Sequence, residues 1–266
     1  MATRLVQQKF GEAAADYAAS AVHARGESIP RMIALIAPQP DWRALDVATG
    51  AGHTAHALAP LVAHVVASDI TDPMLAEAQK LASEKGLQNF ETAHADAEAL
   101  PFADQSFDLV NCRLAAHHFP DPAAFVGEAW RVLKAGGFLA VVDNIGADAV
   151  SLPGWSQEEV AAADRAYDAY ERLRDPSHAR SLQLDEWVDL MTARGFGNIR
   201  TERMPQHIAF GPWVKRMRCS AETTARLEAM LAAEPLHTLL APREGPDGRQ
   251  FTLQEAIVVA RKPGDA

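Results

Sequence analysis

Short apolar runs alternate with helix-like segments over residues 44–144, and this alternation limits the fold more than any other feature of the sequence. Five strand-like runs occur there, at residues 44–48, 65–69, 90–96, 107–113 and 138–144. Because these runs are almost continuously apolar, we expect both faces of the strands to be buried. Strands that alternate with helices favour a parallel sheet covered by helices on both faces. The sequence therefore predicts an α/β fold.

The rhythm of strands and helices breaks after Asp143. The rest of the chain contains a mostly helical stretch at residues 146–182 and a helix at 184–194. A strand-like run at 199–210, a helical stretch at roughly 212–240, a loop at 242–248 and a last strand-like run at 255–262 follow. We predict a single domain over residues 1–266, with a sheet of about seven strands whose last hairpin is antiparallel. Residues 40–145 form its core. The two helical insertions, 146–182 and 211–250, are expected to form a cap over the ligand-binding edge of the sheet.

Composition limits the kinds of partner and the cellular compartment that we expect for this protein. The formal net charge of −10 argues against nucleic acid as a main partner, because phosphate binding depends on clustered Lys and Arg. Cys112 and Cys219 have neither a metal-type spacing nor a disulfide framework. The sequence contains no run of about 18 apolar residues and no signal-like N-terminal run. We expect a cytoplasmic protein without a membrane span, and leave open whether it forms a homodimer.

A glycine turn directly follows the first strand-like run. Gly50 and Gly52 can adopt positive φ angles and lack a Cβ, as a backbone that passes close to a bulky ligand requires. The segment from Gly50 to Ala55 also matches the dinucleotide fingerprint G-x-G-x-x-G/A, and Asp69 at the end of the second run could bind a ribose. The turn alone therefore fits a nicotinamide-dependent oxidoreductase as well as a methyltransferase.

Two further acids and a long ordered block favour the methyltransferase. Asp46 lies within the first run, where a dehydrogenase usually has an apolar residue, and Asp96 closes the third run, where it can accept a hydrogen bond from an adenine amino group. The segments LDVATGAGHTA, SDITDPML, HADAEALPFADQSFDLV and RVLKAGG occur in this order over residues 44–143. This block resembles class I S-adenosylmethionine-dependent methyltransferases, especially the group of ubiquinone and menaquinone biosynthesis enzymes. GAGHTA, CRLAAHHF and RLRDPSH also resemble a bacterial group whose substrate is unassigned.

The resemblance implies a Rossmann-like fold, S-adenosylmethionine as cofactor, and a set of cofactor-binding positions. These positions are Tyr17, Asp46, Ala48, Gly50, Gly52, Asp69, Ile70, Met74, Asp96, Ala97 and Cys112. Asp69 would bind the ribose hydroxyls, Asp96 and Ala97 would meet the adenine edge, and Tyr17 would close over the cofactor. Ala48 departs from the pattern, because many members of the family carry glycine there.

Methyl transfer from a sulfonium is a direct displacement, so a base is required only when the acceptor arrives protonated. His117 comes after the fourth strand-like run, and we predict that it is this base. The residues that we expect to bind a small-molecule acceptor are His118, Asp143, Arg174, His178 and Arg180. A structural role in packing, helix capping or a solvated helix end stays open for each of them. No zinc pattern occurs, so we expect no metal.

The acceptor atom is expected to be oxygen or carbon rather than nitrogen. The absence of an Asn/Asp-Pro-Pro-Tyr motif after the fourth run argues only against amino-group methylation of the nucleic-acid type. A protein that binds S-adenosylmethionine without catalysis, as a sensor or scaffold, is the main alternative from another functional class.

Overall fold

The computed structural model describes Leu5, Gln7, residues 26–246 and residues 248–264. The strands are β1 (Arg43–Val47), β2 (His64–Asp69), β3 (Phe90–His94), β4 (Phe107–Arg113), β5 (Leu133–Asn144), β6 (Gly197–Ala209), β7 (Arg243–Gly245) and β8 (Gly248–Arg261). The helices are α3 (Ser28–Ile36), α4 (His53–Leu58), α5 (Asp72–Glu84), α6 (Pro122–Val132), α7 (Gln157–Arg174), α8 (Leu184–Arg194), α9 (Phe210–Arg216), α10 (Ala221–Leu231) and α11 (Leu236–Leu240), with short 3-10 helices η1 (Ala59–Leu61) and η2 (Ala116–His118).

The strands form one sheet in the order β3-β2-β1-β4-β5-β8-β6. The pairs among β1 to β5 are parallel, whereas β8 is antiparallel to both β5 and β6. This confirms the predicted α/β fold with an antiparallel last hairpin. The sheet has an eighth strand, because β7 pairs with the start of β8. The prediction of a loop over residues 242–248 was therefore wrong for Arg243–Gly245.

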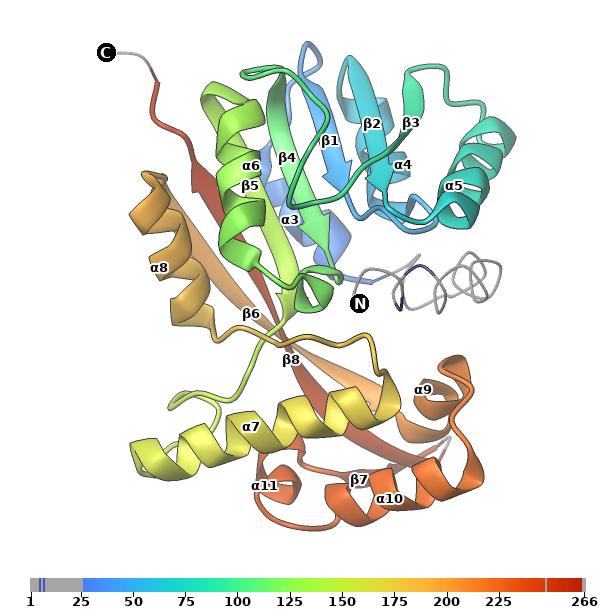
Figure 1. Cartoon of the computed structure of the whole chain (residues 1–266), viewed down its shortest axis with the longest axis vertical. Coiled ribbons are helices and arrows are strands. Elements are labelled where there is room, and N and C mark those ends of the chain that lie inside the picture. Colours follow the sequence, from blue (N-terminus) through green and yellow to red (C-terminus); the bar gives the residue numbers. More distant parts are fainter. Residues whose placement is uncertain (1–4, 6, 8–25, 247, 265–266) are drawn as a thin grey trace.

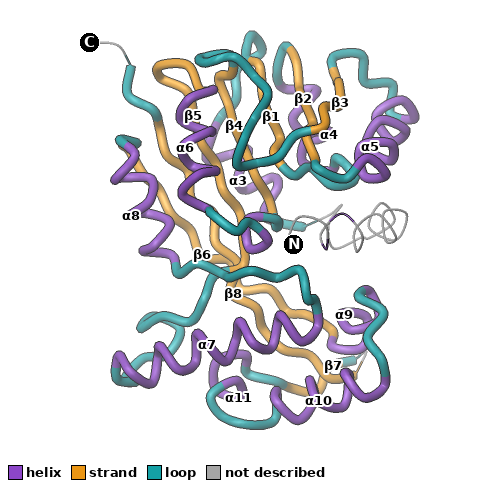
Figure 2. The backbone as a smooth tube through the Cα atoms, viewed as in Figure 1, coloured by secondary structure: helices purple, strands orange, loops and turns teal. Residues whose placement is uncertain are grey.

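Helices cover both faces of the sheet, as Figure 2 shows. α6 and α8 pack one face, and α3, α4 and α5 pack the other. Between residues 256 and 260, alternate side chains of β8 enter first one of these two cores and then the other. The near-continuous apolar runs in the sequence are explained by this burial on both faces.

The β6–β8 hairpin is much longer than the sheet to which it belongs. β8 pairs with β5 only over residues 255–261, whereas its pairing with β6 runs from Arg261 back to Gln250. The protruding half of the hairpin carries a third apolar core, to which α7, α9, α10 and α11 contribute. These helices lie together beyond the carboxyl ends of the parallel strands (Figure 1). The two insertions are thus packed on a continuous extension of two strands.

Several predicted element boundaries differ from the structure. Residues 146–182 are helical only within α7, and residues 146–155 are loop and turn. The third strand ends at His94, so Asp96 lies beyond it in an isolated bridge with Ala99. The fifth strand begins at Leu133, five residues before the apolar run at residues 138–144 that predicted it. These ends have little periodic signal, because turns and strand ends are set by contacts from other elements.

Candidate functional site

A cavity lies where the carboxyl ends of the parallel strands meet. Its wall contains Ala48, Thr49, Gly50, Ala51, His53, Thr54, Asp69, Ile70, Thr71, Met74, Ala95, Asp96, Ala97, Glu98, Arg113, Leu114, Ala115, His118, Phe119 and Pro120. These residues come after β1, β2, β3 and β4, or close those strands. Ligands of open α/β sheets bind at this edge, so the cavity is the candidate cofactor site.

The turn after β1 has the backbone geometry that its glycines predict. Gly50 and Gly52 have φ angles of 54° and 83°. A Cβ added to Gly50 would meet no atom within 4 Å, whereas one added to Gly52 would lie 2.8 Å from the His56 ring. Gly50 thus leaves space open toward the cavity, and Gly52 permits close packing behind it. Ala48 also adopts a positive φ of 53°, so alanine meets the requirement that glycine meets in many relatives.

Asp69, the last residue of β2, links two parts of the cavity wall. Its carboxylate accepts hydrogen bonds from the backbone N–H groups of Gly50 and Thr71, each at 2.9 Å. Burial raises the pKa of Asp69, and these hydrogen bonds oppose the rise. Each carboxylate oxygen can accept more than one hydrogen bond, so Asp69 can hold the turn and still accept from a ligand hydroxyl.

Asp46 lies behind the cavity wall rather than in it. Its side chain accepts hydrogen bonds from Thr49 Oγ1 at 2.5 Å, from the Ala55 N–H at 3.1 Å and from the Asn111 amide. Burial raises its pKa to about 6, while these bonds and Arg113 act in the opposite direction. Asp46 therefore shapes the turn from beneath, and any effect on a ligand would pass through the turn.

Seven of the predicted cofactor residues line the cavity: Ala48, Gly50, Asp69, Ile70, Met74, Asp96 and Ala97. Gly52, Asp46 and the fully buried Cys112 do not. Tyr17 falls outside the described residues. The sequence interpretation missed Arg113. Asn111 and Arg113 interrupt the apolar run of β4 at alternate positions, and this period-two polar pattern could have revealed both residues.

His117 forms a close pair with Asp143, the penultimate residue of β5. Its Nδ1 lies 2.6 Å from Asp143 Oδ1, and its backbone N–H donates to Asp143 Oδ2 at 2.8 Å. Burial lowers the pKa of His117, but the charge and the hydrogen bond of Asp143, together with the charges of Glu171 and Asp175, outweigh this effect and raise the pKa overall. A carboxylate only accepts, so Nδ1 carries the proton and Nε2 is left as the basic nitrogen.

His118, rather than His117, lines the cavity. Its Nδ1 lies 3.1 Å from the carbonyl oxygen of Ser177, which can only accept, so Nδ1 donates there. Burial and the neighbouring His117 lower the pKa of His118. The two rings lie 4.2 Å apart, and the ring of His178 lies 5.5 Å from that of His117 on another side. His118 is thus a neutral group between the cavity and the loop after α7.

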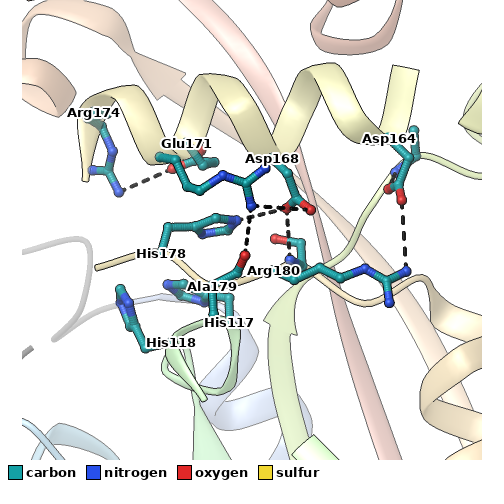
Figure 3. Close-up of polar contacts among 12 residues, drawn as sticks. His117, His118, Asp164, Asp168, Glu171, Arg174, His178, Ala179 and Arg180 are labelled. Carbon is teal, nitrogen blue, oxygen red and sulfur yellow. Dashed lines mark hydrogen bonds and ion pairs between the residues drawn. The ribbon is translucent and has the colours of Figure 1, made fainter. Parts of the chain in front are cut away.

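Arg174, His178 and Arg180, which were also predicted to bind the acceptor, lie where the C-terminal part of α7 and the loop after it meet η2; we call this contact region the joint (Figure 3). Arg174 pairs with Glu171 at 3.3 Å and stacks over Trp213. His178 Nε2 lies 2.8 Å from Asp168 Oδ1. None of Arg174, His178, Arg180 and Asp143 belongs to the cavity wall.

Arg180 belongs to the same joint. Its side chain binds Glu186 at 2.7 Å and is 46% exposed. The backbone N–H groups of Ala179 and Arg180 both donate to the carbonyl oxygen of His117, at 2.9 and 3.1 Å. The loop after α7 and the histidines of η2 are therefore held together as one unit.

The residues present fit S-adenosylmethionine chemically. The space beside Gly50 admits a ligand close to the backbone, and the wall supplies carboxylates for hydroxyl and amino groups together with apolar surface at Ile70 and Met74. Among the described residues, no group of three or more His, Cys, Asp and Glu side chains is arranged to hold a metal ion. In the same part of the chain, no helix has the length and apolar character needed to cross a membrane.

Comparisons with known proteins agree with this chemistry. Residues 45–141 match the family model described as a methyltransferase domain. The uncharacterized methyltransferase YcgJ of Bacillus subtilis is 36% identical over 207 residues, which are 78% of each chain. The crystal structure of that YcgJ protein superposes with a TM-score of 0.80 at 30% identity, covering 90% of this chain and 99% of the other.

Two further similarities are informative. The crystal structure of BH2331 from Bacillus halodurans C-125 also gives a TM-score of 0.80, at 34% identity over 90% of this chain and all of the other. The ubiquinone/menaquinone biosynthesis C-methyltransferase UbiE of Brucella canis is 34% identical over 145 residues, about half of each chain. The likeness to YcgJ spans most of both proteins, so this chain belongs to the class I S-adenosylmethionine-dependent methyltransferases, enzymes whose cofactor is S-adenosylmethionine.

Proposed function

We propose that this methyltransferase transfers the methyl group of S-adenosylmethionine to an oxygen or carbon atom of a small-molecule acceptor, with His117 as the general base. The observation that carries this proposal is the His117–Asp143 pair, in which the ring of His117 lies 4.2 Å from that of His118 in the cavity wall. An oxygen or an activated carbon must lose a proton during transfer, and a histidine oriented by a carboxylate is suited to remove it.

The cofactor's parts are assigned along the edge of the sheet. Asp96 beyond β3 would accept from the adenine amino group, with Ala97 beside it, and Asp69 at the end of β2 would accept from the ribose hydroxyls. The glycine turn after β1 would receive the methionine portion. The spatial order β3-β2-β1-β4 supports this assignment, because it matches the order of the chemical groups along the cofactor. When bound, the cofactor supplies an already activated methyl group.

His117 is the better base of the two adjacent histidines. The pKa of His117 is raised, whereas burial lowers that of His118. A base with a pKa nearer to the working pH accepts a proton more readily in the transition state. His118 lines the cavity, beside the ring of His117, and we assign it to binding and orienting the acceptor molecule.

The two helical insertions are proposed to act as a cap over a single domain. Residues 40–145 carry the cofactor site, and residues 146–182 and 211–250 would exclude water from the reacting atoms. Asp143 acts on the acceptor through His117. Arg174, His178 and Arg180 act on it through the loop after α7, which their partners hold against η2.

The chemistry of the surroundings supports a small apolar acceptor. Most of the cavity wall is apolar, and the net charge of −10 disfavours nucleic acid. The relative UbiE is named as a C-methyltransferase of quinone biosynthesis. A phenol, a quinol or a compound with an acidic C–H group therefore has priority over an amine.

Release of S-adenosylhomocysteine should be measured with a panel of phenols, quinols, acidic C–H compounds and amines. With the accepted class, His117→Ala should lower kcat by roughly 10²- to 10⁴-fold and leave the dissociation constant of S-adenosylhomocysteine nearly unchanged. His207→Ala is the matched control, because His207 is an exposed histidine on β6 that contacts Thr252. Unaltered turnover in His117→Ala would remove it as the base. Tight cofactor binding without turnover on any acceptor would favour a sensor or scaffold.

A further inference from the structure

Arg113 closes β4 and gives the cavity its positive charge. Among the described residues of the cavity wall it is the only Lys or Arg, whereas Asp69, Asp96 and Glu98 supply the acids. The acids lie at or beyond the ends of β2 and β3, and Arg113 lies at the end of β4. Since β1 lies between β2 and β4, the charges of the wall are divided between the two sides of the glycine turn.

The Arg113 side chain is held in place by its surroundings. Its Nε donates to Ser28 Oγ at 3.0 Å, at the first residue of α3. Burial lowers the pKa of the Arg113 guanidinium, and the charges of Glu255 and Asp46 oppose this shift. A guanidinium stays charged in proteins and presents its donors in a rigid planar fork. The cavity therefore has a fixed cation beside the turn rather than a mobile surface charge.

The separation of charges matches a ligand that is anionic at one end and polar but uncharged at the other. Neighbouring strands lie about 4.8 Å apart, so the ends of β2 and β4 are separated by about 10 Å. The amino-acid portion of S-adenosylmethionine carries a carboxylate, and its ribose carries only hydroxyl groups. A carboxylate near Asp69 would be repelled, whereas one near Arg113 can form charge-assisted hydrogen bonds.

We infer that Arg113 binds the α-carboxylate of the cofactor and thereby determines which side of the cavity receives its amino-acid portion. This inference rests on the proposed placement of the cofactor along the sheet edge. It assigns Ser28 as a positioning residue, which acts through the Nε hydrogen bond. It also explains why a charged residue ends a strand whose preceding residue, Cys112, is fully buried.

Isothermal titration calorimetry with two ligands tests the inference without turnover. S-adenosylhomocysteine carries the carboxylate, and S-adenosyl-3-thiopropylamine has the same amine, sulfur and nucleoside but no carboxylate. Arg113→Gln should weaken binding of S-adenosylhomocysteine by roughly 10- to 100-fold, the range for a lost charge-assisted hydrogen bond. Binding of the decarboxylated ligand should stay within about twofold of the unmodified protein, because the contact is absent in both cases.

Two variants serve as controls. Arg31→Gln removes another arginine near the start of α3 that pairs with Glu202 on β6 outside the cavity, and should leave both affinities unchanged. Ser28→Ala should weaken only S-adenosylhomocysteine, and by less than Arg113→Gln. Equal losses for both ligands in Arg113→Gln would show a structural effect and overturn the inference, as would unchanged binding of S-adenosylhomocysteine. If the variants show the expected pattern of affinities but the unmodified protein methylates no acceptor, the proposed function fails and the role of Arg113 stands.

Discussion

Alanine substitutions at Gly50 and Gly52 should distinguish the contribution of the turn to stability from its contribution to ligand binding. Both residues have positive φ, which costs an alanine about 1–2 kcal/mol. At Gly50 nothing else opposes the new methyl group. At Gly52 the Cβ would lie 2.8 Å from the His56 ring and 3.0 Å from Ala78 Cβ. The His56 ring cannot move away freely, because its Nε2 donates a hydrogen bond to the carbonyl oxygen of Ala78 at 2.9 Å.

Overpacking of this kind adds about 1–3 kcal/mol, so Gly52→Ala should lose about 2–5 kcal/mol of unfolding free energy and Gly50→Ala only about 1–2 kcal/mol. At roughly 2–4 °C per kcal/mol, calorimetric melting should separate the two variants. In titration with S-adenosylhomocysteine the order should be reversed, with the larger loss of affinity in Gly50→Ala. The methyl group of Gly50→Ala enters the cofactor space and should weaken binding at least about tenfold, a cost of about 1.4 kcal/mol.

Two results would refute this reasoning. One is an equal loss of melting temperature in Gly50→Ala and Gly52→Ala, which would mean that the space beside Gly50 is filled. The other is an unchanged dissociation constant in Gly50→Ala, which would place the cofactor elsewhere. A useful reference is Gly154→Ala, because Gly154 also has positive φ and open space around its Cβ but lies outside the cavity.

Three further substitutions probe the site and the joint with the cap. Asp69→Ala should weaken S-adenosylhomocysteine binding by roughly 1–3 kcal/mol, and an unchanged dissociation constant in titration would contradict its assignment. The acid limb of the kcat/KM pH profile should lie above the ordinary histidine pKa of about 6.5, because His117 must be neutral to act and its pKa is raised: Asp143, Glu171 and Asp175 together outweigh the effect of burial. Asp143→Asn should move that limb to lower pH, and a limb that does not move would exclude His117 as its source. Gly146→Ala would place a Cβ 2.9 Å from the carbonyl oxygen of Ser181, so we expect a loss of about 1–3 kcal/mol in denaturant unfolding, whereas a stability equal to that of the unmodified protein would show that the joint can shift.

The amino-acid sequence was enough to predict the parallel part of the sheet and the location of the candidate cofactor site. Apolar runs alternating with helical segments indicate strands buried on both faces, and this signal is local in the chain. Gly50 indicated the turn by its conformational freedom, and Asp69 and Asp96 stood out as acids at or near the ends of apolar runs. Because parallel strands place their carboxyl ends at one edge, these separate signals predicted one shared site.

Which polar side chains meet could not be predicted in this way, because it depends on how the elements pack in three dimensions. His117 and Asp143 come from different strand ends, and their 2.6 Å contact results from the adjacency of β4 and β5. Arg113 belongs to the cavity because β4 lies beside β1; the alternation of Asn111 and Arg113 in the sequence marks two polar positions but does not show what they face. The contact of Arg174 with Trp213 depends likewise on the packing of α7 against α9. Periodicity reports which face of an element is buried, whereas a partner across the fold is chosen by topology and packing, and local sequence carries little information about either.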